Sequence, residues 1–231
     1  MKNKIQKLKE KTLKLNNRLV DNGLVLLTWG NASIANRSEG LIAIKPTGIS
    51  YGELTAGDIV VIDIDGNVVD GTLKPSSDTA THLFLYKFFT KISSVIHTHS
   101  HWATIWAQAG QEIPVLGTTH ADHFYGNIPC TRKLTPEEVA GEYEKNTGKV
   151  IVEAFEGIDP ENIPAVLVNN HGPFCWGINA GDALNNAIVL EEIARMAYHT
   201  LQITNTPPID RSLLDKHFLR KHGEQSYYGQ D

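Results

Sequence analysis

The 231-residue chain contains only two cysteines, Cys130 and Cys175, and no CxxC pair. So few thiols exclude a disulfide framework and argue against a thiolate zinc site; a single bridge between them stays open, but two free thiols fit better. No stretch approaches the roughly 18 apolar residues of a membrane-spanning helix. The N-terminus also lacks the apolar run of a secretory signal. We therefore predict a cytoplasmic protein with no membrane partner.

An excess of positive charge and the common nucleotide-binding signatures are also missing. The formal net charge is -5, which argues against a nucleic-acid partner because such proteins usually carry a basic surface. Neither a Rossmann nor a P-loop glycine pattern occurs. Hydrophobic residues make up 41% and charged residues 20%, as in ordinary globular proteins. Without a linker, a repeat or a low-complexity segment, residues 1–231 are predicted to form one domain.

Apolar periodicity and turn signals predict a mixed α/β fold. A hairpin is predicted through residues 37–40, and Asp65-Gly66 predicts a second tight turn, so the sheet should be at least partly antiparallel. Thr135, Pro136 and Glu138 form a capping box that starts a helix, which Asn146-Thr147-Gly148 should interrupt. The predicted helices are 3–22, 79–89, 101–109, 136–145, 181–201 and 212–223; the predicted strands are 33–36, 41–44, 59–64, 68–69, 95–99 and 165–168.

What the chain does have is histidine, ten in all. His97-Thr98-His99 continues an apolar run that predicts a strand, and residues two apart on a strand face the same side. Both imidazoles would then form half of a site for an ion such as zinc; two unrelated histidines at a strand end are the alternative. His171 follows another predicted strand. Asp78 opens a predicted helix; it could be a further ligand, and the alternative is that it simply caps that helix. His101 should turn away, because a helix is predicted to begin there.

Two loops of similar composition suggest a phosphate site. Lys45-Pro46-Thr47-Gly48 and Lys74-Pro75-Ser76-Ser77 each combine a lysine, a proline and small residues that expose hydroxyl or backbone N–H groups. Gly30-Asn31 could join them. Proline, glycine and serine are also the ordinary residues of loops, so each loop alone says little. Thr119-His120-Ala121-Asp122 offers an imidazole and a carboxylate in a predicted loop, for which a local hydrogen bond is the simpler interpretation.

Together these segments resemble the class II aldolase and adducin-head family, and within it the L-ribulose-5-phosphate 4-epimerases. The resemblance runs through nearly the whole chain. The segments that carry it are 28–31, 45–48, 74–78, 97–100, 117–122, 128–132, 171–173, 213–217 and 227–229.

The resemblance implies a three-layer α/β/α domain with a mainly antiparallel sheet. It also implies one Zn²⁺ per subunit, with Mn²⁺ or another divalent ion as the alternative, and a homotetramer with active sites at subunit interfaces. An acid/base pair, Asp122 and Tyr228, would act across that interface. The implied metal ligands are Asp78, His97, His99 and His171; the implied substrate contacts are Gly30, Asn31, Lys45, Thr47, Gly48, Ser76 and Ser77. Thr47 stands where these epimerases often carry serine, and it keeps the hydroxyl.

The activity that the resemblance implies is interconversion of L-ribulose 5-phosphate and D-xylulose 5-phosphate by metal-assisted cleavage and re-formation of the C3–C4 bond. The C4 hydrogen is not adjacent to the carbonyl, so proton abstraction alone cannot invert C4. The nearest rival is an aldolase of the fuculose- or rhamnulose-phosphate type; aldolases of this family typically carry glutamate where this chain has Asp78. A non-catalytic interaction module and a zinc store are weaker alternatives. Arabinose catabolism, ascorbate or another route could supply the substrate.

Overall fold

The computed structural model describes residues 2–222 and 226–227. The helices are α1 (Lys2–Asp21), α2 (Thr79–Phe88), α3 (His101–Ala109), α4 (Thr118–Ala121), α5 (Pro136–Ala140), α6 (Tyr143–Glu153), α7 (Ala180–Ile203) and α8 (Arg211–His222). The strands are β1 (Asn31–Asn36), β2 (Leu41–Ile44), β3 (Val60–Asp63), β4 (Val68–Asp70), β5 (Ser94–His97), β6 (Ala165–Leu167) and β7 (Pro173–Gly177). Among these helices, none is long and apolar enough to span a membrane.

The strands form one seven-stranded sheet in the order β4-β3-β2-β1-β5-β7-β6. Every pairing between these strands is antiparallel, and both predicted hairpins are present as β1–β2 and β3–β4. The long connection from β2 to β5 returns the chain beside β1, so that Asn31 lies opposite His97. This pairing places the start of β1 beside the end of β5, where the predicted metal ligand His97 lies.

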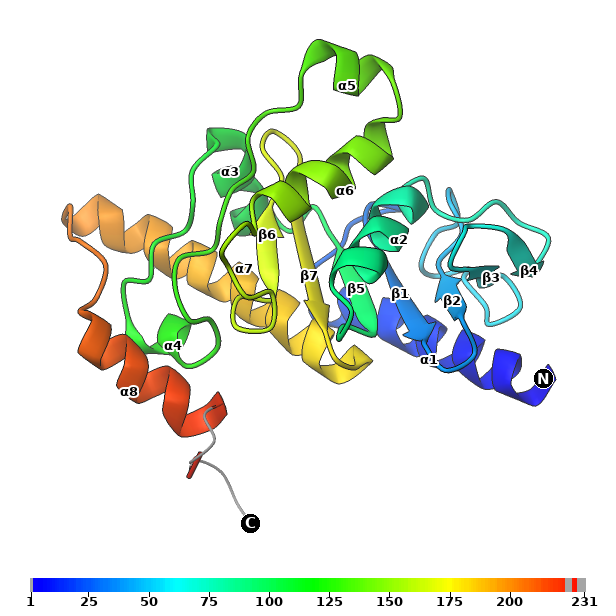
Figure 1. The fold of residues 1–231 in the computed structure, drawn as a ribbon, viewed down its shortest axis with the longest axis horizontal. Coiled ribbons are helices and arrows are strands. Elements are labelled where there is room, and N and C mark those ends of the chain that lie inside the picture. The colour runs from blue at the N-terminus through cyan, green and yellow to red at the C-terminus, as the bar shows by residue number, and fades with distance from the viewer. Residues whose placement is uncertain (1, 223–225, 228–231) are drawn as a thin grey trace.

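Helices cover both faces of the sheet, as expected for three layers (Figure 1). The long helices α1 and α7 pack on one face, and α2 and α6 pack together on the other. Strand residues such as Val60, Ile96, Val166 and Phe174 are fully buried, because the helices cover both faces of the sheet away from the exposed strand β4. The α/β/α prediction is therefore confirmed.

Two strand predictions need correction near the histidines. The predicted strand 95–99 ends at His97, because the chain turns into α3 at Ser100, the residue before its first turn. His99 therefore lies outside the strand. Strand β7 was not predicted, because Gly172-Pro173 resembles a turn; Pro173 is instead the first residue of the strand, a position that tolerates the missing N–H.

Two further corrections concern helices. The predicted interruption at 146–148 is wrong: α6 runs through Gly148, and a Cβ there would come within 2.6 Å of the Phe84 Cβ. Glycine at this position allows α2 and α6 to approach closely. The segment around Thr119 and His120, predicted as a loop, forms the one-turn helix α4, with Asp122 directly after it. The capping box at Thr135 is confirmed.

Candidate metal centre and phosphate loops

Three histidines converge at the end of β5. The possible ligand atoms of His97, His99 and His171 all lie within 4.8 Å of one another. His97 Nε2 lies 3.1 Å from His99 Nε2, and the His97 ring centroid is 4.7 Å from that of His171. His97 is buried, His171 is half-buried and His99 is exposed. The group thus forms a cluster with a buried base and an exposed mouth.

Hydrogen bonds to the outer nitrogens orient two of these rings. His97 Nδ1 lies 2.9 Å from the carbonyl oxygen of Pro173, which can only accept, so Nδ1 carries the proton and Nε2 presents a lone pair to the cluster. The ring of His97 also stacks on Phe174 at 4.2 Å. His171 Nδ1 lies 3.3 Å from the Tyr143 hydroxyl. These partners are typical of metal-binding histidines, whose outer nitrogen is usually held by a second residue.

Desolvation and mutual repulsion favour the uncharged form of two of the three rings, His99 and His171. Partial desolvation of its ring at the cluster, with nearby His97 as the second cause, lowers the pKa of His99 to about 4. Burial and the neighbouring His97 and His99 also lower the pKa of His171. Because a metal binds neutral imidazole, these shifts leave the two rings ready to ligate at neutral pH.

Asp78 is not among the residues whose ligand atoms cluster, but its carboxylate interacts electrostatically with His97 and His171. It precedes α2, but its side chain forms no cap hydrogen bond with that helix, so capping does not explain the residue. Its Oδ2 instead accepts from Asn31 Nδ2 at 2.6 Å. Burial would raise the pKa of Asp78, but electrostatic interactions with His97 and His82 and the hydrogen bond from Asn31 lower it overall.

Gly30 permits a close approach of backbone at this edge of the sheet. It has φ +82°, and a Cβ there would lie 2.7 Å from the His97 carbonyl oxygen. Any larger residue would push the start of β1 away from β5. The Gly30 carbonyl also accepts from the Tyr51 hydroxyl at 2.9 Å. Gly30 therefore keeps Asn31 against the histidine cluster.

The two lysine-proline loops lie side by side. Pro46 pairs with Pro75 in an antiparallel bridge, and the Ser76 N–H donates to the Lys45 carbonyl at 3.0 Å. Thr47, Gly48 and Ser77 are exposed, whereas Ser76 is buried. Lys45 is also buried; its Nζ donates to the Ile49 carbonyl at 2.7 Å, and burial lowers its pKa. The structure thus joins the two loops into one surface, and the second loop ends directly before Asp78.

Comparison with known proteins identifies the family. The family described as Class II Aldolase and Adducin N-terminal domain matches residues 10–198. The chain belongs to this family.

Individual members show how similar the chain is. It is 54% identical over 227 residues to L-ribulose-5-phosphate 4-epimerase UlaF of Salmonella paratyphi A (strain ATCC 9150 / SARB42), a match that covers 98% of this chain and all of that protein. The UlaF protein of Salmonella typhi matches equally well, at 54% identity and the same coverage. Among solved structures, an L-fuculose 1-phosphate aldolase superposes with a TM-score of 0.78 at 27% identity, covering 91% of this chain and 94% of that chain.

In this member of the class II aldolase family, Asp122 lies apart from the three histidines. It directly follows α4, which packs against α8 at one end of the molecule, whereas the histidines lie at the end of β5 (Figure 1). Asp122 accepts from His217 Nδ1 at 2.9 Å and from Arg220 at 2.9 Å, and it pairs with Lys221 at 3.2 Å. Burial alone would raise the pKa of Asp122, but the contacts with His217, Arg220 and Lys221 outweigh it and lower the pKa. Tyr228 lies outside the described residues.

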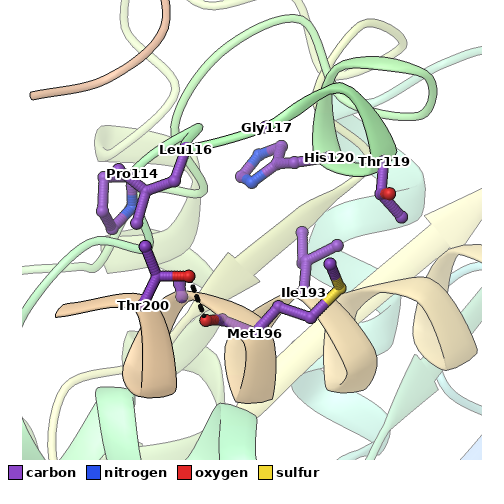
Figure 2. Close-up of a pocket in the computed structure, with 9 residues that line it drawn as sticks. Pro114, Leu116, Gly117, Thr119, His120, Ile193, Met196 and Thr200 are labelled. Carbon is purple, nitrogen blue, oxygen red and sulfur yellow. Dashed lines mark hydrogen bonds between the residues drawn. The ribbon is translucent and has the colours of Figure 1, made fainter. Parts of the chain in front are cut away.

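A small cavity of about 110 Å³ lies between α4 and α7 (Figure 2). His120 and Thr119 line one side, and Ile193 and Met196 of α7 line the other. His120 Nε2 is tied to the Gly126 carbonyl at 2.8 Å. None of the three clustered histidines lines this cavity, so it is distinct from the candidate metal centre.

The sequence-based predictions did not include three residues that support the site. Tyr143 contacts His171, His82 lies buried one helical turn after Asp78, and Glu191 binds the start of α3. Only His82 had a sequence signal, because residues four apart on a helix share a face. The other two contacts join segments far apart in the chain.

Proposed function

We propose that the protein is an L-ribulose-5-phosphate 4-epimerase, which inverts C4 of the sugar by breaking and re-forming the C3–C4 bond. The observation that carries the proposal is the convergence of three imidazoles, two of which interact electrostatically with the Asp78 carboxylate. The 54% identity to UlaF over 98% of the chain favours the epimerase within the family.

His97, His99 and His171 would hold a divalent ion, with Asp78 as the fourth ligand. The converging nitrogens, within 4.8 Å of one another, fit such an ion, and imidazole with carboxylate suits Zn²⁺. When bound, the ion supplies a Lewis acid for the oxygens beside the broken bond. Asp78 stays ionised for this role because its pKa is lowered, and Asn31 fixes its orientation.

The joined loops would bind the substrate phosphate. Ser76, Ser77 and Thr47 supply hydroxyl groups, and Gly48, which has φ +71°, leaves its backbone uncovered by a side chain. Lys45 would act mainly by closing its own loop through Ile49 and by adding positive charge. Phosphate held here keeps the two-carbon aldehyde in place after cleavage, so that it can turn and recombine.

Asp122 and Tyr228 would transfer protons on opposite faces of C4. Inversion requires a base on one face and an acid on the other. Asp122 is ionised beside His217 and Arg220, which is the state that a base needs, and the same contacts lower its pKa and therefore its strength as a base. Because Asp122 lies apart from the histidines of its own chain, we infer that a neighbouring copy in a homotetramer brings it to the site. Sedimentation of the purified protein should therefore show a tetramer.

The main rival is a sugar-phosphate aldolase, favoured by the superposition on L-fuculose 1-phosphate aldolase. The two activities differ in their products from L-ribulose 5-phosphate. An epimerase yields D-xylulose 5-phosphate, whereas an aldolase releases a two-carbon aldehyde phosphate. Release of the aldehyde without any pentulose product would overturn the epimerase proposal.

Metal binding and turnover should fail together when a ligand is removed. We expect Asp78→Asn and His97→Asn to lose bound metal and most activity, because each deletes one donor of the cluster. His101→Asn is the matched control, since His101 is exposed at the start of α3 and outside the cluster. Metal content by atomic emission and a coupled assay with and without chelator give the two readouts. Full metal content and full turnover in either ligand variant would refute the site.

A further inference from the structure

A buried histidine lies behind the candidate metal centre. His82 on α2 is 1% exposed, and its Nδ1 lies 2.7 Å from the Ser33 hydroxyl. Its Nε2 is buried and has no hydrogen-bond partner among the described residues. The ring meets Phe174 edge to face at 6.0 Å, and Phe174 stacks on His97. A buried polar nitrogen without a partner costs about 1–3 kcal/mol, so its retention needs a reason.

The partners of Ser33 indicate which nitrogen of His82 carries the proton. The Tyr86 hydroxyl lies 2.8 Å from Ser33 Oγ and 3.2 Å from the Ser33 carbonyl. Tyr86 has one hydroxyl hydrogen, and in the shorter of its two contacts it donates this hydrogen to Ser33 Oγ. The Ser33 hydroxyl is then left to donate to His82 Nδ1. The proton of the neutral ring then resides on Nε2. Ser33 and Tyr86 thus make Nε2–H a donor that still lacks an acceptor.

Asp78 is the nearest carboxylate in the chain. The His82 N–H donates to the Asp78 carbonyl at 3.0 Å, so the two residues are one helical turn apart. Side chains at that spacing lie on the same face of a helix. The two side chains also interact electrostatically, since each contributes to the pKa of the other. An N–H dipole beside a carboxylate is favourable, which again selects the Nε2–H form.

We propose that His82 is a positioning residue for Asp78: its Nε2–H, held by Ser33 and Tyr86, donates to the Asp78 carboxylate when that carboxylate ligates the ion. Asn31 supplies the other donor, at Oδ2. Two donors fix the orientation of the carboxylate, and such outer hydrogen bonds commonly change metal affinity by about 10–100-fold. The inference rests on the proposed function, because it takes Asp78 as a ligand.

Two substitutions of His82 separate positioning from packing. Gln places its amide nitrogen close to the Nε2 position, whereas Asn reaches only the Nδ1 position. We expect His82→Asn to bind Zn²⁺ about 10–100-fold more weakly in chelator competition. His82→Gln should bind close to the wild-type value. Thr12→Ala is a control for lost stability alone, because Thr12 is buried on α1, across the sheet from α2.

The outcomes distinguish the two proposals. Wild-type protein that binds no Zn²⁺ would refute the metal site itself. Wild-type binding with unchanged affinity in His82→Asn, or with equal loss in His82→Gln, would refute only the role of His82. If His82→Asn does not fold, ¹⁵N NMR of the wild-type holoprotein decides. Nε2 of His82 should be the protonated nitrogen at pH 7, and a proton on Nδ1 would overturn the inference.

Discussion

The third histidine of the cluster depends on one hydroxyl group. The hydroxyl oxygen of Tyr143, at the start of α6, lies 3.3 Å from His171 Nδ1. His171 itself lies in the loop between β6 and β7 and not on a strand. We expect Tyr143→Phe to weaken metal binding by about tenfold or more, because the ring loses the partner that sets its orientation. Chelator competition measures this change.

Tyr125→Phe is the matched control for this substitution. It also removes a hydroxyl group, which lies in the loop after α4 and donates to Asp215 of α8 at 2.6 Å. Its metal affinity should equal that of the wild type. If Tyr143→Phe bound metal as tightly as this control, Tyr143 would have no part in orienting His171.

At single positions, the sequence was informative where spacing or a motif is local. His97 and His99 are two residues apart, and the structure does bring them together with His171. The prediction that both histidines lie on one strand is only partly right, because the strand ends at His97 and His99 lies beyond it. Tyr143 could not be predicted, since its contact with His171 spans 28 positions and exists only once α6 packs beside the sheet.

The start of α3 is held by a side chain from another helix. Both carboxylate oxygens of Glu191 on α7 accept backbone N–H groups, from Trp102 at 2.8 Å and from Ala103 at 3.0 Å. A carboxylate here accepts from two backbone N–H groups that have no partner within the helix, and its negative charge interacts favourably with the positive N-terminal end of the helix dipole. Glu191→Gln keeps the shape but loses the charge and one acceptor. We expect it to lower the free energy of unfolding by about 1–2 kcal/mol.

Urea denaturation measures this effect, with Glu192→Gln as its control. Glu192 is the adjacent residue, is exposed, and pairs only with Arg195 among the described contacts. Its substitution should change stability by less than about 0.5 kcal/mol. Equal losses in the two variants would show that Glu191 contributes no more than a surface charge.

Helix α6 shows why a residue's local preference can mislead. Gly148 lies mid-helix against Phe84 of α2, where a Cβ would come within 2.6 Å of the Phe84 Cβ. Gly148→Ala would gain helix propensity of about 1 kcal/mol but would force α2 and α6 apart. We expect a net loss of stability by thermal denaturation. Lys149→Ala, on the exposed side of the same helix, should change stability little; a more stable Gly148→Ala protein would contradict the packing argument.

The same contrast holds for the other elements. The antiparallel sheet and most helices follow from apolar periodicity and turn residues, which are local signals. Strand β7 and the uninterrupted α6 do not, because Pro173 and Gly148 have local preferences that tertiary packing overrides. Under the proposed function, a neighbouring copy brings Asp122 to the histidines, and no pattern within a single chain encodes that arrangement.

For the molecule as a whole, buried neutral histidines set the response to acid. Burial lowers the pKa of His82 to about 3 and that of His120 to about 4. In the unfolded chain both should titrate near about 6.5. Between these values the unfolded state binds more protons than the folded state, so stability is fully present above about pH 6.5 and falls as the pH decreases toward 4. Each histidine contributes up to about 1.4 kcal/mol per pH unit.

Urea denaturation of chelator-treated protein at pH 7, 6 and 5 measures this dependence without competition from metal. His120→Gln isolates one of the two groups, because the amide can still donate to the Gly126 carbonyl that His120 now contacts. The variant cannot take up a proton on unfolding, so its stability should fall less steeply between pH 6 and 5 than that of the wild type. A wild-type stability that is constant from pH 7 to 5, or an equal slope in His120→Gln, would show that buried histidine does not govern the acid response.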